Sequence, residues 1–341
     1  MENVLILDTS VGSANKGDDI IMKCVRHHLL DITKDNYVYT LPTHVSPFHW
    51  YQVARKSYRV QTFSNAKYKF VGGSNLLTMN MLTHFPQWNI NLFNYGPLAG
   101  SILVGVGAGK GDKINKYTKM LYNKVLSHKY IHSVRDERTK KILEDMGFKA
   151  INTGCATLWS LTPEFCKEIP KGKSDSVVFT LTYNPDGPLK EDQLLIDTLN
   201  KNYKNVHFWI QGDQDLNYLK HFNNIKNIHI IPPTVDDFDR ILNTDVDYIG
   251  TRLHGGIFAM RHKRRAIIIA IDERARGMSD TYNINSIDRN DLGNLEIMIN
   301  SDFATEVNVD FNKVNAWLSQ FDISRGSHKD FSKKQLEVLT R

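Results

Sequence analysis

The chain has 341 residues, about twice the length of a typical domain, so it is long enough for two domains that each bury a core. Its 41% hydrophobic and 23% charged residues are ordinary for a globular protein, and no apolar run approaches the ~18 residues of a membrane-spanning helix. The net charge of +6 is modest and the basic residues are mostly dispersed, so we expect no nucleic-acid partner.

Apolar, strand-like runs alternate with helical stretches from the N-terminus onward, which is the βαβα pattern of a doubly wound parallel sheet. Val4 to Leu7 is cut off by Asp8 and has no basic leader, so we interpret it as a first strand and not as a signal peptide. Helices are expected at Asp19 to Leu30 and Arg135 to Met146. The strands expected in the first half are Val4 to Leu7, Tyr68 to Val71, Ser101 to Val104 and Tyr130 to Ser133.

The segment Pro170 to Ser174 has the composition of a linker, and the alternation restarts after it. The second half is expected to contain strands at Ser176 to Thr182, Val206 to Gln211, His229 to Ile231, Tyr248 to Ile249 and Ala266 to Ile271. Its expected helices are Leu189 to Asn202, Asp215 to Phe222, Asp236 to Leu242 and one that starts at Gly256. We therefore predict an α/β protein of two Rossmann-like, doubly wound domains, residues 1–165 and 174–310, facing a cleft. Residues 311–341 look helical from Phe311 to Leu339 and are expected to pack back on the first domain.

Several patterns that would indicate metal or nucleotide chemistry are absent. The three cysteines, Cys24, Cys155 and Cys166, form no Cys-x-x-Cys pair, which argues against a disulfide framework or a zinc site and suits a reducing cytoplasm. Gly105 to Asp112 lacks the residues that a phosphate loop or a dinucleotide motif needs at its ends. Asp245 and Asp247 directly precede a predicted strand, which favours a capping or solvated position over a metal site.

The segment Tyr248 to Ala259 is the strongest functional signal, because an apolar strand runs into a turn with Arg252 and His254 and a helix follows. The first amides of a helix have no intrahelical partner, and the helix dipole adds partial positive charge there. Arg252 adds a planar donor group that matches phosphate or carboxylate, and His254 exchanges a proton near neutral pH. This segment predicts an anion site at the carboxyl end of a strand, where open α/β sheets bind ligands.

Glycines and polar residues follow other predicted strands. The glycines allow backbone to approach a ligand closely, with tight turns as an equally weighted alternative. Asn15 and Asp18 lie in the first strand-to-helix turn and are expected to face the cleft. For Asp18, a cap on the adjacent helix and a contact with an acceptor remain open alternatives.

These segments together resemble the polysaccharide pyruvyl transferase family. The resemblance covers roughly residues 1 to 285. It rests on Asn15-Lys16-Gly17-Asp18, Gly72-Gly73-Ser74-Asn75, Gly105-Val106-Gly107-Ala108-Gly109, Ser133-Val134-Arg135-Asp136-Glu137-Arg138 and the late Arg252-Leu253-His254 turn. The chain departs from the family at Thr153 to Trp159, where many members have Pro-Asp-Pro, and at Arg274, where a lysine is usual.

The resemblance implies a GT-B-like architecture and transfer of the pyruvyl group of phosphoenolpyruvate to two hydroxyls of a sugar as a cyclic ketal, without a metal or cofactor. It implies His254 as the acid that protonates the donor, Arg252 and Arg135 as anion-binding residues from opposite domains, and Asp18 as a candidate base. The substrate-binding residues that it implies are Asn15, Gly17, Gly73, Ser74, Asn75, Gly107, Leu253, Gly255 and Arg274.

The acceptor is less defined. A galactose-type sugar with free 4- and 6-hydroxyls is the family-level expectation, and its carrier is left open between a lipid diphosphate, a nucleotide and a polymer. Phe48 to Tyr51 and Phe85 to Trp88 offer aromatic faces for a sugar ring. We interpret the basic run Arg261 to Arg265 as the C-terminal end of a helix, where positive charge offsets the helix dipole. Contact of this run with an acidic membrane surface is the alternative. The protein is therefore expected in the cytoplasm, with peripheral contact to the inner face of the membrane as one option.

Two functions of other classes remain open at this stage. A nucleotide-sugar glycosyltransferase on the same architecture would need a carboxylate for the ribose hydroxyls, and Glu273 is the candidate. A non-catalytic scaffold that binds an anion would need no titratable group at Arg252 and His254.

Overall fold

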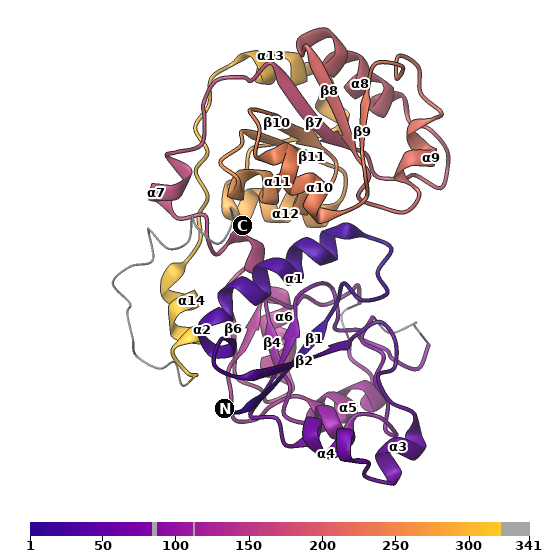
Figure 1. Cartoon of the computed structure of the whole chain (residues 1–341), viewed down its shortest axis with the longest axis vertical. Coiled ribbons are helices and arrows are strands. Elements are labelled where there is room, and N and C mark those ends of the chain that lie inside the picture. Colours follow the sequence, from indigo (N-terminus) through magenta and orange to yellow (C-terminus); the bar gives the residue numbers. More distant parts are fainter. Residues whose placement is uncertain (84–86, 112, 322–341) are drawn as a thin grey trace.

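The computed structural model describes residues 1–83, 87–111 and 113–321, which form two α/β domains stacked along the long axis of the molecule (Figure 1). The predicted fold class is confirmed, because each domain is built on parallel strands with helices between them. Within the described ranges, no helix is long and apolar enough to cross a membrane.

The N-terminal domain has a four-stranded parallel sheet in the order β2-β1-β3-β4. Its strands are β1 (Asn3–Asp8), β2 (Tyr37–Pro42), β3 (Tyr68–Gly72) and β4 (Ile102–Val104). A second parallel pair, β5 (His132–Val134) and β6 (Ala150–Asn152), is joined to this sheet region by a parallel bridge between Val106 and Val134. The helical elements are α1 (Lys16–His28), α2 (Leu30–Thr33), α3 (Trp50–Ala54), α4 (Tyr58–Ser64), η1 (Gly96–Leu98), α5 (Lys116–Val125), α6 (Glu137–Asp145), η2 (Ala156–Leu158) and α7 (Pro163–Cys166).

The C-terminal domain has one six-stranded sheet in the order β12-β11-β10-β7-β8-β9, and every pair in it is parallel. Its strands are β7 (Ser176–Thr180), β8 (Asn205–Trp209), β9 (His229–Ile231), β10 (Asp247–Gly250), β11 (Ala266–Ala270) and β12 (Ser286–Asp288). The helical elements are α8 (Lys190–Asn202), α9 (Asp215–Leu219), α10 (Val235–Leu242), α11 (Leu253–Arg261), α12 (Glu273–Tyr282), η3 (Arg289–Asn294) and α13 (Leu295–Asn300). A last helix, α14 (Phe311–Leu318), follows this domain in the chain.

Strands β2, β6 and β12 were not expected from the sequence. β2 is an edge strand with no fully buried residue, and β6 and β12 have three residues each, so none of them is a buried apolar run. Two helix starts also differ from the expectation. Arg135 precedes α6, whose N-cap is Asp136, and His254 lies in the first turn of α11, whose N-cap is Arg252.

Both sheets have a switch point, where the chain changes the direction in which it adds strands. In the C-terminal sheet this point lies between β7 and β10, and in the N-terminal sheet between β1 and β3. The carboxyl ends of strands at such a point diverge and leave a crevice for a ligand. The loops after these four strands therefore mark the expected position of a site.

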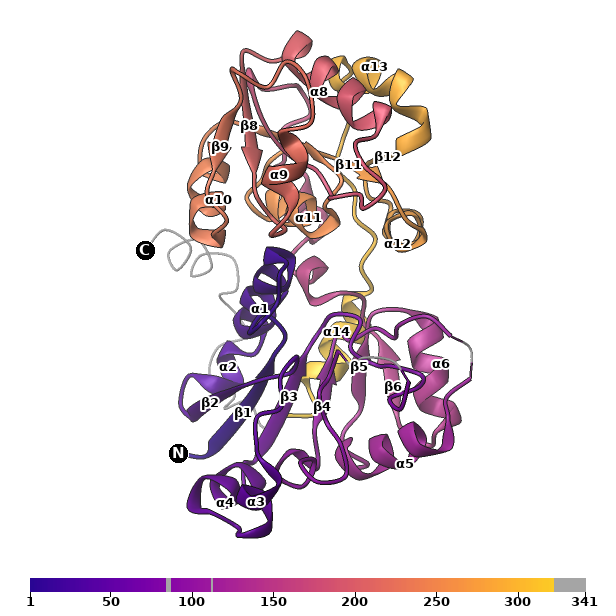
Figure 2. The same cartoon turned by 90° about the vertical axis from the view of Figure 1, so that its right-hand side faces the viewer.

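The domains are joined by direct contacts around α1. Ile20 and Cys24 of α1 share one buried apolar cluster with Leu253, Ile257 and Phe258 of α11. The backbone N–H of Lys16 donates to Gln211 O at 2.8 Å, and that of Asp213 donates to Ala14 O at 3.1 Å. Figure 2 shows α1 immediately below the C-terminal domain. Apolar burial and backbone bonds together hold the two domains face to face.

Helix α14 lies against the N-terminal domain, although it follows the C-terminal domain in sequence (Figure 1). Val314 and Trp317 pack in the cluster that contains Phe70 of β3, and Trp317 Nε1 donates to Ile131 O at 2.8 Å. The helix ends at Leu318, well before the expected end at Leu339. The expected helical residues 322–339 lie outside the described part of the chain.

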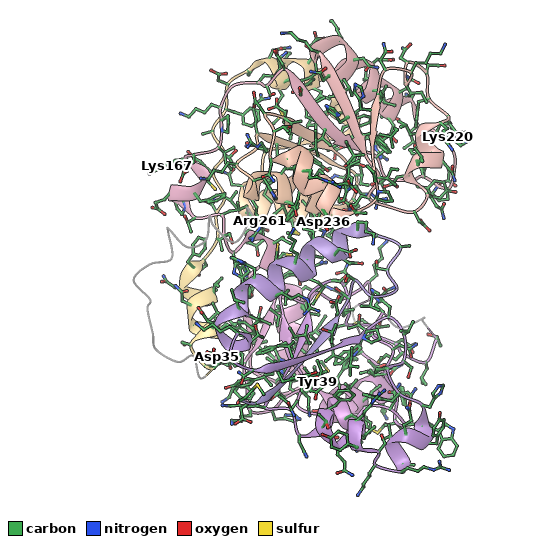
Figure 3. The ribbon with its side chains drawn as sticks, viewed as in Figure 1. Asp35, Tyr39, Lys167, Lys220, Asp236 and Arg261 are labelled. Atoms are coloured by element: carbon green, nitrogen blue, oxygen red, sulfur yellow. The ribbon has the colours of Figure 1, made fainter. Side chains whose placement is uncertain are left out.

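The basic run Arg261 to Arg265 faces the interior of the protein. Arg261 Nη1 donates to Thr157 O at 3.3 Å and lies at the junction of the domains (Figure 3), and Arg264 Nε donates to Leu242 O at 2.8 Å. Arg265 is buried and pairs with Asp247 at 3.0 Å. The run is therefore structural and does not form a membrane-facing surface. Asp247 is itself buried in its ion pair with Arg265, so the interpretation of Asp247 as a capping or solvated residue is wrong.

His132 gives the fold a specific sensitivity to acid. It is fully buried, with Nδ1 accepting from Leu103 N–H at 3.2 Å and Nε2–H donating to Ser127 O at 2.9 Å, and burial lowers its pKa to about 4. Because the unfolded chain binds this proton near pH 6.5, stability is lost as the pH falls from 6.5 towards 4. The wild type should lose about 1.4 kcal/mol per pH unit more than His132→Gln across this interval.

Urea unfolding at a series of pH values measures this difference. Glutamine keeps one acceptor and one donor for the two buried bonds, and the exposed His221→Gln should follow the wild type. Parallel pH dependences for the wild type and His132→Gln would contradict the assignment.

Candidate active site

Two pockets open where the loops of both domains meet. The Arg252 pocket, of about 670 Å³, is lined by Gly12, Ser13, Ala14, Asn15, Asp18, His44, Val45, Gln87, Thr182, Tyr183, Gly212, Asp213, Gln214, Asp215 and Arg252. The Arg135 pocket, of about 980 Å³, is lined by Asn75, Ala108, Gly109, Lys110, Gly111, Arg135, Asp136, Glu137, Arg138, Asn152, Asp272, Glu273, Arg274, Arg276, Gly277, Met278, Thr281 and Tyr282. Each pocket is therefore built from both domains, at the carboxyl ends of their strands.

Arg252 is held in place by a carboxylate. Its Nε donates to Asp215 Oδ2 at 3.2 Å and to Leu181 O at 3.3 Å, and Nη2 pairs with the second oxygen of Asp215. Its backbone is fixed as well, because the Tyr248 hydroxyl donates to Arg252 O at 2.7 Å. The guanidinium is thus partly neutralised by a buried bidentate partner, which makes it a weaker anion site than its sequence position indicates.

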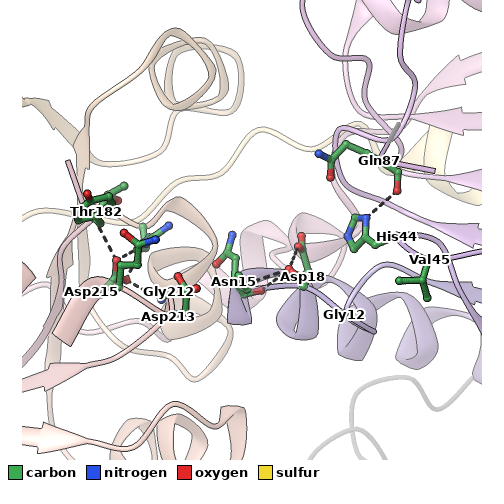
Figure 4. Close-up of a pocket in the computed structure, with 15 residues that line it drawn as sticks. Gly12, Asn15, Asp18, His44, Val45, Gln87, Thr182, Gly212, Asp213 and Asp215 are labelled. Carbon is green, nitrogen blue, oxygen red and sulfur yellow. Dashed lines mark hydrogen bonds and ion pairs between the residues drawn. The ribbon is translucent and has the colours of Figure 1, made fainter. Parts of the chain in front are cut away.

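Asn15 and Asp18 face the Arg252 pocket from the start of α1 (Figure 4). Asn15 is the N-cap of α1, since its Oδ1 accepts from Gly17 N at 3.0 Å, and the same oxygen accepts from Gln211 Nε2 at 2.9 Å across the domain interface. Asp18 is therefore not the cap. It accepts a hydrogen bond from Ser13 Oγ at 2.6 Å, and burial raises its pKa, which makes the carboxylate a better proton acceptor.

Arg135 is the central cation of the other pocket. It is only 7% exposed, Nη2 donates to Asn75 Oδ1, and Nε lies 3.6 Å from Asp136 Oδ2. The space for its side chain depends on Gly107, because a Cβ there would lie 2.7 Å from Arg135 Cζ. Burial lowers the pKa of Arg135, yet an arginine stays charged at neutral pH.

The two pockets differ in charge. Among the described residues, five basic and four acidic side chains line the Arg135 pocket, whereas one arginine and three carboxylates line the Arg252 pocket. In the Arg135 pocket, Asp136 and Asp272 also accept backbone N–H bonds as helix N-caps, from Thr139 and Ala275. An anionic ligand therefore fits the Arg135 pocket better than the Arg252 pocket.

His254 lies buried between the domains. Its Nε2 is 3.8 Å from Cys155 Sγ, which belongs to the segment before η2 of the N-terminal domain. Burial, together with the smaller effect of the positive charges of Arg274 and Arg135, lowers the pKa of His254 to about 3. The ring is therefore neutral at pH 7 when no ligand is bound.

The structure brings some predicted residues together and separates others. His254, Arg135 and Arg274 interact electrostatically, and Asn75 and Gly107 contact Arg135. Arg252, by contrast, lines the other pocket, so it does not lie opposite Arg135 as expected. The cation of the C-terminal domain that lines the Arg135 pocket beside it is Arg274.

Other predicted binding residues have packing roles. Leu253 is buried in the core. Gly17, Gly73 and Gly255 have no room for a side chain. A Cβ at Gly73 would lie 2.5 Å from Gly105 O, and a Cβ at Gly17 would lie 2.9 Å from Gln211 Nε2. A Cβ at Gly255 would lie 2.8 Å from the Tyr248 hydroxyl. Ser74 O accepts from Gly107 N at 2.8 Å, which positions the loop beside Arg135. These residues shape the site without lining either pocket.

The predicted aromatic faces do not line the site. Phe48 and Trp88 are buried in the core, while Trp50 and Tyr51 are exposed away from both pockets. Phe85 lies outside the described residues. The aromatic side chains at the pockets are Tyr183 and Tyr282.

Sequence reasoning also missed Asp215 and Cys155. The run Gly212-Asp213-Gln214-Asp215 after strand β8 was a usable signal, since polar residues follow a buried strand there. Cys155 gave no comparable signal. In the part of the chain that the structure describes, no group of three or more His, Cys, Asp or Glu side chains is placed to hold a metal ion.

Similar solved structures include a UDP-GlcNAc 2-epimerase and a heptosyltransferase. UDP-GlcNAc 2-epimerase from Methanocaldococcus jannaschii is 14% identical, with a TM-score of 0.52 over 94% of this chain and 100% of that chain. The E. coli heptosyltransferase WaaC is 13% identical, with a TM-score of 0.42 over 93% of this chain and 99% of that one. The first of these likenesses supports the Rossmann-like GT-B fold and nothing about substrates.

Sequence comparison is more specific about the family. No curated protein matches the chain significantly. The model of the polysaccharide pyruvyl transferase family matches residues 15–273, which include Asp18, Arg135 and Arg252 of the two pockets and the buried His254. The chain therefore belongs to the polysaccharide pyruvyl transferase family.

Proposed function

We propose that this protein transfers the pyruvyl group of phosphoenolpyruvate to two hydroxyls of a sugar, forming a cyclic ketal. The observation that supports this most is the Arg135 pocket, which Arg135 and Arg274 line from opposite domains, while the buried His254 interacts electrostatically with both arginines. Phosphoenolpyruvate carries a phosphate and a carboxylate, and two arginines can bind both groups through planar, bidentate hydrogen bonds.

The Arg252 pocket suits the sugar acceptor. Its three carboxylates, with His44, Gln87 and Thr182, offer hydrogen-bond partners for neutral hydroxyls and disfavour an anion. Asp18 lines this pocket and interacts electrostatically with Arg274, so it lies between the two ligands. A galactose-type ring with free 4- and 6-hydroxyls is the acceptor that we propose.

The chemistry follows from this division. His254 delivers a proton to the methylene carbon of the donor, and the carbon that bears the phosphate becomes cationic. A sugar hydroxyl then forms a bond to that carbon while Asp18 takes the hydroxyl proton. The C–O bond to phosphate breaks, phosphate leaves with the electron pair, and the second sugar hydroxyl bonds to the same carbon and closes the ring. In the net reaction one hydroxyl proton ends in the new methyl group and the other leaves with phosphate. The enzyme supplies a general acid, a base and fixed positive charge.

Binding of the donor is the direct test of the proposal. Phosphoenolpyruvate should raise the melting temperature in the presence of a chelator, and at a hundredfold excess over Kd it should stabilise the fold by about 2.7 kcal/mol. A panel of sugar nucleotides in the same assay is the comparison. A shift with a sugar nucleotide and none with phosphoenolpyruvate would favour a glycosyltransferase.

Gly107→Ala should weaken use of the donor, because the new Cβ would displace Arg135 from Asn75. Loss of one charged hydrogen bond costs about 1.5–3 kcal/mol, so KM for the donor should rise roughly ten- to a hundredfold, as in Arg135→Lys. Gly109→Ala in the same pocket is the control, since its Cβ would meet Leu77 O at an ordinary 3.7 Å. Equal kinetics for Gly107→Ala and Gly109→Ala would remove Arg135 from the donor site.

A further inference from the structure

The sequence contains a long stretch without acidic residues. From Asn36 to Gly111 there is no Asp or Glu, although 37 of the 341 residues of the chain are acidic. The same stretch contains Arg55, Lys56, Arg59 and three further lysines. Neither the fold nor the proposed chemistry accounts for this imbalance of charge.

The structure gathers part of this stretch on one surface, where residues 43–59 and 87–96 lie side by side. Asn89 N donates to Thr43 O at 2.7 Å, Asn94 Nδ2 donates to Ser46 Oγ at 2.8 Å, and a Cβ at Gly96 would lie 3.8 Å from Val53. Helices α3 and α4 form the end of the N-terminal domain that is remote from the C-terminal domain (Figures 1 and 2). We call this surface the aromatic–basic face, and we define it by its exposed large apolar residues, lysines and arginines, which are Val45, Trp50, Tyr51, Arg55, Lys56, Tyr58, Arg59, Leu92 and Phe93.

Large apolar side chains project from this face. Trp50 is 67% exposed, Tyr58 84% and Phe93 73%. Arg55 lies over the ring of Tyr51, with its Cζ 6.0 Å from the ring centre. No carboxylate of the described residues forms an ion pair with Arg55, Lys56 or Arg59, so their charges remain available to a partner. Exposed apolar side chains that gather in one patch with polar residues around them are typical of an interaction surface.

We propose that the aromatic–basic face binds the surface of an anionic lipid bilayer. Tryptophan and tyrosine partition to the headgroup level of a membrane, where one part of the ring is apolar and another is wet. Arginine and lysine near that level are attracted by anionic headgroups, and an absence of carboxylates removes the opposing repulsion. A soluble polyanion would use the cations but would leave Trp50 and Phe93 in water.

The face is continuous with the Arg252 pocket. His44, Val45 and Gln87 line that pocket and belong to the same two segments, and His44 Nδ1 lies 2.7 Å from Gln87 O. Docking would therefore hold at the membrane the domain from which His44, Val45 and Gln87 reach the acceptor pocket, which suits a saccharide carried on a lipid. This assignment of the carrier rests on the proposed function, whereas the docking itself does not.

Vesicle sedimentation tests the docking without any measurement of catalysis. At low salt the protein should bind vesicles that contain phosphatidylglycerol and not vesicles of phosphatidylcholine alone. Removing three charges in Arg55→Gln/Lys56→Gln/Arg59→Gln should weaken binding about fivefold per charge, or roughly a hundredfold. The control Lys190→Gln/Lys201→Gln/Lys204→Gln removes the same net charge from exposed positions of the C-terminal domain and should bind like the wild type.

Tryptophan fluorescence gives a second readout from the face itself. Trp88, Trp159, Trp209 and Trp317 are buried, so a blue shift of emission on binding reports Trp50, and Trp50→Phe should abolish it. Equal loss of binding in both triple variants would overturn the proposal, as would binding to dextran sulfate with none to the anionic vesicles. Vesicle binding is measured without phosphoenolpyruvate, so a failure to bind vesicles would not contradict the proposed function. In the same way, a failure of phosphoenolpyruvate to raise the melting temperature would not contradict the docking.

Discussion

Replacing His254 with glutamine should lower turnover about 10²–10⁴-fold while leaving the affinity for phosphoenolpyruvate within a few-fold of the wild type. Glutamine has a similar size and hydrogen-bonding capacity, but it cannot deliver a proton. In the empty enzyme, burial and the charges of Arg274 and Arg135 hold the pKa of His254 near 3. A bound phosphate and carboxylate would offset those charges and raise the pKa, so the acid would form only with the donor in place.

The control is His262→Gln, at the other end of the same helix. His262 is the C-cap of α11 and contacts Asp239 at 2.8 Å, far along the helix from the turn that carries His254, so its loss should change stability and not turnover. Turnover in deuterium oxide adds a direct readout, because the proton added to the methylene carbon must appear as deuterium in the methyl group of the ketal. Normal turnover of His254→Gln, or product without that label, would show that His254 only holds phosphate.

Asp247→Ala should destabilise the protein by about 3–5 kcal/mol, or roughly 6–20 °C in Tm, which is the largest effect that we expect on stability. Asp247 Oδ2 accepts from Arg265 Nη1 at 3.0 Å and from the Tyr203 hydroxyl at 2.8 Å, and all three side chains are buried. Without Asp247, the charge of Arg265 would stay buried without a counter-ion. Urea unfolding of both proteins at pH 7 measures the difference.

Two further variants show whether pairing is the cause. Glu296→Ala removes the exposed partner of Lys201 in the same domain and should cost less than about 1 kcal/mol. Asp247→Leu/Arg265→Met replaces the whole pair with apolar side chains and should be more stable than Asp247→Ala. If Asp247→Ala unfolded at the same urea concentration as the wild type, the ion pair would have no net role in stability.

The sheets were largely predictable because their strands are locally encoded. β1, β7 and β11 are continuous apolar runs, and such runs are typical of strands buried on both faces of a parallel sheet. β2 was missed because none of its residues is fully buried, and β6 and β12 because all their residues are only half-buried, so no buried apolar run marks these strands.

The candidate site was only partly predictable. Arg135, Asn75, Gly107 and Arg274 were all selected from the sequence, and the structure places them around one pocket. The sequence predicted that Arg252 and Arg135 share one site, but they line different pockets. Asp215, which lies 37 positions before Arg252 in the chain, holds the Arg252 guanidinium in its own pocket. The environment of His254 depends on Cys155, 99 positions away in the other domain. A local motif has no information about either partner.

By itself, the sequence determined which segments form buried strands, which turns carry glycine, arginine and histidine, and thereby the family. These features depend on neighbours a few residues apart, through side-chain periodicity and helix capping. Only the tertiary structure decided which cations of the site remain available to a ligand, and that the site consists of two pockets of different charge. Those properties arise when the domains dock, because docking determines which distant carboxylates and apolar surfaces meet each side chain.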